Sequence, residues 1–208
     1  LGVSGAALQG LFRNPLADPG LIGVSAGAAL GAVSAIVFLN VELLPFQLGK
    51  YLIPLAAILS SCAVICLIFI LTNGFKKSDI TYVLLIGIAL NALATVGIGL
   101  LTFISTDSQL RGLTYWMMGS FGAASWGLLV PAFFIIVLSI LTLIFIARKL
   151  DIMQLGEVEA YRLGVEVKKL KMMVILISAL MVGISVSLSG IIGFVGLVVP
   201  HLVRLIAG

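Results

Sequence analysis

Long stretches of this sequence carry no ionisable side chain, and this scarcity excludes most soluble folds. Only 10% of the 208 residues are charged, whereas 62% are hydrophobic. A soluble globular domain carries roughly a quarter charged residues, because its surface faces water. The composition therefore predicts an integral membrane protein. At roughly 20 residues per spanning helix, the chain has room for about six to eight spans and none for a separate soluble domain.

The sequence also lacks the motifs that most hydrolases and nucleotide-binding proteins need. It contains no HExxH, no paired carboxylates, and no GxxxxGK followed by Ser or Thr. We therefore expect no enzyme, no metal site and no cofactor bound by this chain, so that any driving ATP is bound by a partner subunit. The uncharged spans lack the buried relay groups of ion- or proton-coupled secondary transporters. Such a transporter remains the alternative function, and a membrane scaffold without transport is a second one.

Histidine and cysteine are too few to build a metal centre. His201 is the only histidine, and a lone imidazole cannot complete a metal site. We expect it to make a structural hydrogen bond near the cytosolic boundary. Cys62 and Cys66 lie four residues apart, so they share one helix face and cannot form a disulfide without breaking the helix. Both are expected to be packing residues.

Uncharged stretches mark the expected helices, and Gly or Pro divides the two stretches that are too long for one crossing. Leu1–Phe12 is expected to be the end of a helix, and both ends of the chain look like cuts through a larger protein. Further helices are expected at about Val24–Leu39, Tyr51–Phe75, Ile80–Thr106, Tyr115–Met118, Gly127–Ala147, Met172–Leu188 and Leu197–Ile206.

Basic residues are distributed unequally between the two sides of the predicted bundle. Threading the helices alternately through a bilayer leaves only Lys50 and Arg111 on one side. Cytosolic loops favour Lys and Arg, so the other side is predicted to be the cytosol. The net charge of +4 then reflects loops beside membrane lipid, and no nucleic-acid partner is expected. The ten cytosolic residues are Arg13, Lys76, Lys77, Arg148, Lys149, Arg162, Lys168, Lys169, Lys171 and Arg204.

One predicted cytosolic loop is much longer than a helix connection needs. Residues 148–171 comprise 24 residues and carry 10 of the 20 formal charges of the chain. The centre of this loop, residues 155–164, is expected to form a short helix, with Gly164 in the left-handed position that follows a helix end. The helix would have an apolar face that nothing else in the chain covers, made of Leu155, Val158 and Leu163.

Two polar features have both a structural and a functional interpretation. Asn91 lies deep in a predicted span and shares a small, polar helix face with Gly87 and Ala94. That face is either a close helix contact with an interhelical hydrogen bond or a surface that faces a pore, and the sequence leaves both open. The segment Arg13–Pro19 contains two prolines, which exclude a continuous helix. The small residues of Gly23–Ala28 after it let another backbone approach closely.

Five blocks of sequence, in this order, resemble the FecCD-type permeases of ABC importers, the family that imports ferric siderophores, haem and cobalamin. The resemblance covers essentially the whole chain, and the order of the blocks makes it specific. The blocks are Leu8–Pro19 (LQGLFRNPLADP), Gly23–Ala28 (GVSAGA), Tyr115–Ser120 (YWMMGS), Leu155–Glu157 (LGE) with Leu163 and Gly164, and Gly190–His201 (GIIGFVGLVVPH) with Arg204.

The resemblance implies an all-α, polytopic membrane protein with the helical bundle of a type II ABC importer permease. About seven of the ten helices of the family would be present, in a single permease domain over residues 1–208. The family moves iron–siderophore complexes, haem or cobalamin by alternating access, driven by a separate ATPase subunit that binds the ATP. The other implied partners are a second permease copy or paired homologue and an extracytoplasmic substrate-binding protein. The implied location is the bacterial or archaeal cytoplasmic (inner) membrane.

The resemblance assigns site residues by their positions in the family motifs. The basic Arg13 in the turn before Asn14 and Pro15 favours ferric siderophores as the substrate. The family's cytosolic gate corresponds to Ser78, Asp79, Ile80 and Thr81, and its pathway-lining helix corresponds to the one with Gly87, Asn91 and Ala94. The turns that carry family motifs contain Arg13, Asn14, Pro15, Asp18, Pro19, Pro200, His201 and Arg204. The residues expected to couple to the ATPase are Leu155, Gly156, Glu157, Val158, Ala160, Leu163 and Gly164.

Overall fold

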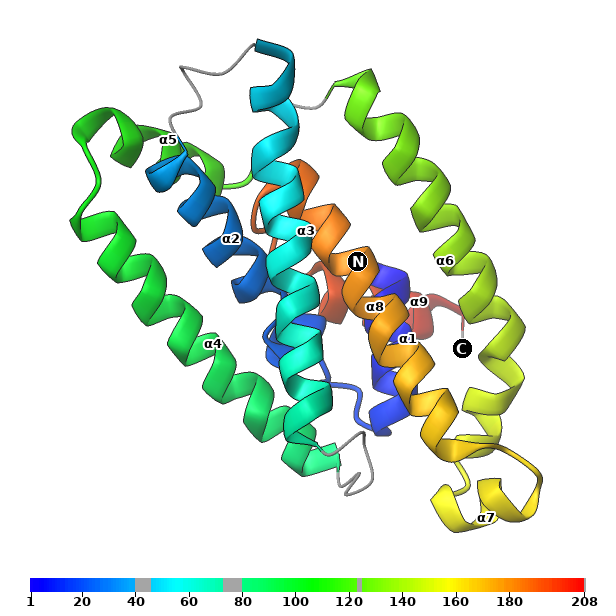
Figure 1. Ribbon diagram of the computed structural model, residues 1–208. Coiled ribbons are helices and arrows are strands. Elements are labelled where there is room, and N and C mark those ends of the chain that lie inside the picture. Colours follow the sequence, from blue (N-terminus) through cyan, green and yellow to red (C-terminus); the bar gives the residue numbers. More distant parts are fainter. Residues whose placement is uncertain (40–45, 73–79, 123–124, 208) are drawn as a thin grey trace.

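The computed structural model describes residues 1–39, 46–72, 80–122 and 125–207, and every regular element in that part of the chain is a helix (Figure 1). Within it, the four helices α3, α4, α6 and α8 are long and apolar enough to cross a membrane. The expected all-α, polytopic fold is confirmed. The elements are α1 (Gly2–Phe12), η1 (Pro19–Ile22), α2 (Val24–Phe38), α3 (Phe46–Leu71), α4 (Ile80–Phe103), α5 (Asp107–Met117), α6 (Trp126–Met153), α7 (Glu157–Arg162), α8 (Val167–Ser189) and α9 (Val195–Ala207).

Helix α8 is the centre of the bundle. It contacts α1, α2, α3 and α6, and Figure 1 shows it running from the α7 end toward the opposite end, between α3 and α6. In the most apolar stretch of α8, 61% of the residues are buried, whereas in that of α4 only 17% are buried. Helix α8 is therefore enclosed mainly by protein, and α4 leaves most of its surface to lipid or to a partner.

Small residues let α2 and α3 approach each other closely. A Cβ atom at Gly31 would overlap the carbonyl oxygen of Ala56, and one at Gly27 would overlap the side chain of Val64. Backbone contact of this kind substitutes for the hydrophobic driving force that helices lack in lipid. The close approach expected for the segment after the double-proline turn is thus present.

The loop that the sequence predicted to be cytosolic is shorter than expected. Helix α6 continues to Met153 and α8 begins at Val167, so the connection is residues 154–166 instead of 148–171. A charge marks where the lipid ends, whereas a helix ends where its ladder of backbone hydrogen bonds ends. The charged residues at the two ends of the predicted loop therefore belong to the last turns of α6 and the first turns of α8.

Helix α5 is longer than expected and begins at Asp107, eight residues before the predicted start. Thr106 caps it: its hydroxyl accepts a bond from the Gln109 backbone N–H, and the Gln109 side chain accepts one from the Thr106 N–H. The Gln109 amide also donates to the Val37 carbonyl at the end of α2 (3.1 Å). The Thr-x-x-Gln capping box is a sequence signal for this helix start.

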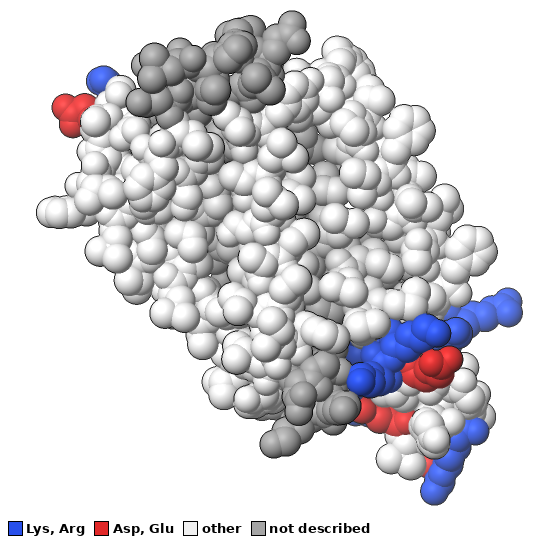
Figure 2. Space-filling view, viewed as in Figure 1, with Lys and Arg blue, Asp and Glu red and all other residues white. Residues whose placement is uncertain are grey.

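Charged side chains gather at the α7 end of the bundle, as Figure 2 shows, and a smaller charged cluster lies near α5 at the opposite end. The surface between them in this view carries no Lys, Arg, Asp or Glu. The side chains of Lys50, Lys76 and Lys77 lie outside the described residues. Among the described cations, Arg111 belongs to α5. Those at or beside the α7 end are Arg13, Arg148, Lys149, Arg162, Lys168, Lys169 and Lys171.

Candidate functional site

Two glycines set the short helix α7 off from its neighbours. Gly156 precedes α7 with a φ of 121°, and Gly164 follows it with a φ of 84°. Residues with a Cβ atom rarely adopt these backbone angles. The chain therefore turns sharply at both ends of six residues, and α7 lies at the end of the bundle, outside the array of spans (Figure 1).

The inner face of α7 is held by one buried alanine and by two polar contacts. Ala160 is completely buried, and its carbonyl accepts a bond from the Val165 N–H (2.9 Å). The Glu157 carboxylate accepts a charged hydrogen bond from the Lys171 ammonium of α8 at 2.6 Å. Just before α7, the Gln154 side chain donates to the Gly10 carbonyl of α1 (2.7 Å). These contacts fix α7 to α8 and the segment before it to α1.

The outer face of α7 presents apolar side chains to solvent. Four of them are between 60% and 75% exposed, and we call these four the coupling surface: Leu155, Val158, Tyr161 and Leu163. The predicted apolar face is confirmed. Tyr161 was not predicted, although it follows Val158 by three residues and so shares its helix face.

The remaining residues of the predicted coupling set shape α7 and do not project from it. Gly156 and Gly164 form its turns, Ala160 packs inward, and Glu157 bonds to α8. Of the predicted gate residues, Ser78 and Asp79 lie outside the described residues. Ile80 and Thr81 open α4, but their side chains also lie outside the described part, so the gate remains a prediction.

The small, polar face of α4 packs inside the chain. The Asn91 amide donates to the Gly20 carbonyl of η1 (2.8 Å). Ala94 is 5% exposed, and a Cβ atom at Gly87 would overlap the backbone of η1. The geometry supports the helix-contact interpretation, and a pathway-lining role for these three residues remains a prediction. The surface that α4 leaves uncovered is a different, apolar one that includes Leu85, Ile88, Leu93, Val96 and Leu100.

We expect Asn91→Leu to lower the free energy of unfolding by about 1 kcal/mol, because the Gly20 carbonyl loses an interhelical hydrogen bond. The thermal unfolding midpoint in detergent measures this loss. Thr95→Val is the matched control, since the Thr95 hydroxyl bonds only within its own helix. A variant that unfolds like the parent but transports more slowly would instead favour the pathway interpretation of Asn91.

The double-proline turn is built by its own polar side chains. Arg13 ends α1 in the left-handed conformation (φ 48°). The Asn14 side chain accepts a bond from the Leu16 N–H (2.9 Å), and the Asp18 carboxylate caps η1 by accepting one from the Gly20 N–H (2.6 Å). With Pro19 buried at the start of η1, these residues return the chain into the bundle.

The last sequence motif packs α9 against α1. Pro200 is buried, and the Arg204 guanidinium donates to the Gln9 side chain of α1. The side chain of His201 is exposed and makes no hydrogen bond with the described residues, so the structural bond expected for it remains a prediction. Consecutive helix residues point about 100° apart. Pro200 points into the bundle, and His201, the next residue, therefore points away from it.

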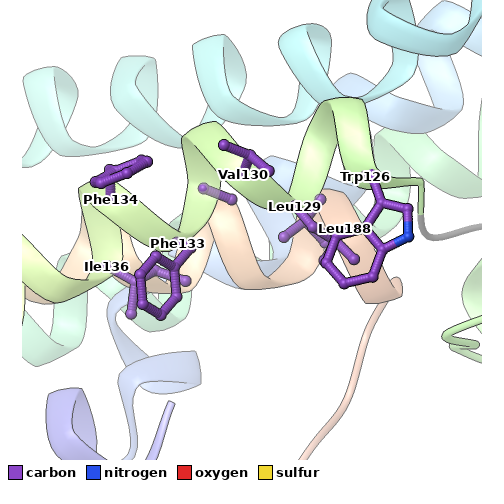
Figure 3. Close-up of a pocket in the computed structure, with 8 residues that line it drawn as sticks. Trp126, Leu129, Val130, Phe133, Phe134, Ile136 and Leu188 are labelled. Carbon is purple, nitrogen blue, oxygen red and sulfur yellow. The ribbon is translucent and has the colours of Figure 1, made fainter.

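A hollow of about 540 Å³ lies beside the first half of α6. Figure 3 shows rings and aliphatic chains of α6 around it, with Leu188 from α8. The eight lining residues are Trp126, Leu129, Val130, Ala132, Phe133, Phe134, Ile136 and Leu188, so the only polar side-chain group among them is the Trp126 N–H. A metal chelate needs more polar partners than this, and we do not assign substrate to the hollow.

Comparison with known proteins places this geometry in a family. The FecCD transport family matches residues 1–208. The chain is 45% identical over 208 residues to the hemin transport system permease protein HmuU of Yersinia pestis. It is 36% identical over 209 residues to the molybdate import system permease protein MolB of Haemophilus influenzae, and 35% identical over 208 residues to the cobalamin import system permease protein BtuC of Halobacterium salinarum.

A solved structure has the same fold. It is an inward-facing conformation of a metal-chelate type ABC transporter, with a TM-score of 0.89 and 35% identity over 100% of this chain and 64% of that one. The three relatives are likewise matched by 100% of this chain, which spans only 61%, 60% and 54% of their own lengths. Because the family match runs from the first residue to the last, the chain belongs to the FecCD transport family.

Proposed function

We propose that this chain belongs to the membrane-spanning permease subunit of an ATP-driven importer, and that a separate ATPase subunit engages it at α7. The observation that carries the proposal is the coupling surface. Its four apolar side chains are each at least 60% exposed, and they lie among charged groups, where lipid tails would not cover them. A protein partner on the cytosolic side is the occupant that fits this position.

We propose a metal chelate as the substrate: an iron–siderophore complex, haem or cobalamin. The relatives' names support this class, since one is a hemin permease and another a cobalamin permease. Hemin is the first compound to test, because the hemin permease is 45% identical to this chain over 208 aligned residues. An extracytoplasmic binding protein would deliver the substrate to the outer face of the permease, which would move it across the bacterial inner membrane.

We propose that the substrate passes between two permease copies by alternating access, along the uncovered side of α4. That side is apolar and carries no fixed charge, as at Leu85, Ile88 and Val96. A smooth wall of this kind would hold a large chelate weakly and release it quickly. It differs from the Gly87 side of the same helix, which faces η1.

The test uses the full-length permease purified with its ATPase and assembled in lipid vesicles, with the substrate-binding protein supplied on the extracytoplasmic side. Val158→Asp and Tyr161→Asp are each expected to cost about 2 kcal/mol or more of binding free energy, because a carboxylate would be buried against the ATPase. Copurification of the ATPase and ATP-driven hemin uptake should both fall to background. Membrane insertion should be unchanged, since both positions are exposed.

The conservative changes Val158→Ile and Tyr161→Phe are the matched controls, because they keep the apolar contact while altering the same side chains. They should retain the ATPase and the uptake of the parent protein. Aspartate variants that still copurify with the ATPase would refute the assignment of α7 as its docking site.

A further inference from the structure

The ion pair between Glu157 and Lys171 differs from the others that the structure describes. The Lys171 side chain is 3% exposed and Glu157 is 35% exposed, with 2.6 Å between the charged atoms. The pairs Glu159–Arg162 and Glu166–Lys169 join residues three apart, and their side chains are 52–78% exposed. Exposed ion pairs of that kind contribute little to the free energy of folding. Of these three pairs, only Glu157–Lys171 joins α7 to another helix.

We propose that the Glu157–Lys171 pair passes the movement of α7 to α8, which makes Lys171 a positioning residue for transport. The inference rests on the proposed function, because it requires an ATPase that moves α7. Few apolar contacts hold α7: of its six residues only Ala160 is buried. Separating α7 from α8 would break this charge-assisted hydrogen bond, and such bonds are stronger than neutral ones. When α7 is displaced, α8 therefore moves with it.

The far end of α8 is joined to α5. The Ser120 N–H donates to the Ser189 carbonyl at 2.8 Å, and Gly119 and Gly190 lie backbone to backbone beside this bond. Helix α8 has 23 residues, and at 1.5 Å per residue it spans about 34 Å. A displacement that enters at Lys171 would thus reach the outer end of the bundle through one rigid, mostly buried helix.

The other connection of this region is weaker. Gln154 bonds to the Gly10 carbonyl as a neutral amide, and its own side chain is exposed. A neutral hydrogen bond in contact with water exchanges readily for one to solvent. We therefore assign transmission to α8 and expect α1 to follow less closely.

The experiment reads movement at the outer end without knowledge of the substrate. Met118, which follows α5, is 75% exposed and is replaced by cysteine in a full-length permease in which Cys62 and Cys66 are alanine. The permease is assembled with its ATPase in lipid vesicles, and the rate of thiol labelling at position 118 is measured with and without ATP. We expect ATP to change this rate about fivefold or more.

Lys171→Met removes the charge and keeps most of the packing volume, and it should abolish the effect of ATP on labelling while the ATPase still copurifies. Lys169→Met is the matched control: it makes the same chemical change two residues earlier, at an exposed site, and should keep the full effect. Glu157→Gln should act like Lys171→Met, and the reversed pair Glu157→Lys with Lys171→Glu should restore the response.

The outcomes separate this inference from the proposed function. A parent permease that does not retain the ATPase would refute the proposed function. A parent that retains the ATPase but shows no ATP-dependent labelling, or a Lys171→Met variant that responds like the parent, would overturn only the inference. If Lys171→Met and Glu157→Gln lost ATPase in proportion to lost folded permease, the pair would be structural and the inference would also be overturned.

Discussion

Replacing Gly5 by alanine is expected to remove most of the folded protein from the membrane. A Cβ atom at this position would overlap the carbonyl oxygen of Gly196, and the Gly196 carbonyl carbon and Cα are also too close. All three atoms are backbone, so no side chain can rotate away and α1 and α9 must separate. Overpacking of this kind costs about 3 kcal/mol or more, which is a large fraction of the stability of a typical domain.

Gly10→Ala is the control for this prediction, because it adds the same methyl group to the same helix. The nearest atom to a Cβ there is the Gln154 side-chain nitrogen, at an ordinary 3.7 Å. The yield of monodisperse protein after detergent extraction and the thermal unfolding midpoint should drop for Gly5→Ala and stay near the parent for Gly10→Ala. Equal midpoints for the two variants would show that α1 and α9 are not in backbone contact.

A similarly large loss is expected for Gly190→Ala, for two reasons that add. Gly190 has a φ of 72°, where a residue with a side chain is strained by about 1–3 kcal/mol. A Cβ atom would also overlap the Trp116 carbonyl oxygen and approach the Gly119 Cα to 3.0 Å. The joint between α5 and α8 should open, so that added protease cuts near residues 117–122 in vesicles at temperatures that the parent resists.

Gly193→Ala tests whether the effect depends on position. It lies three residues later, outside the left-handed region, and a Cβ atom there would meet nothing within 4 Å. Its cleavage should match the parent. If Gly190→Ala resisted protease as well as Gly193→Ala does, the closely packed joint described here would be wrong.

The sequence predicted room for about six to eight spans, and four of the described helices are long and apolar enough to cross a membrane. The starts of two helices were predicted correctly, because lipid imposes a single rule on uncharged runs. An uncharged run of the right length must be a helix in a bilayer, and α2 and α4 begin at the predicted residues Val24 and Ile80. Helix ends outside the lipid follow backbone hydrogen bonds and caps instead. For that reason the connection observed between α6 and α8 is shorter than the loop predicted at 148–171. Helix α5 likewise begins at its capping box, before the predicted start.

The candidate site was predictable only where it follows from local pattern. Leu155, Val158 and Leu163 are apolar residues in a charged segment, and exposure was the natural expectation for them. The bond from Glu157 to Lys171 crosses 14 residues, and the bond from Asn91 to Gly20 crosses 71. Such partners are set by how the helices pack, which composition and periodicity do not specify.

The uncovered side of α4 has a consequence that follows from symmetry. In the proposed pair of identical permeases, a twofold axis beside α4 would repeat every change on that side across the conduit. One substitution such as Ile88→Asp would then place two carboxylates facing each other, whereas a permease paired with a non-identical homologue would receive one. The severity of a single mutation on this helix thus becomes a measure of whether the two halves of the transporter are the same chain.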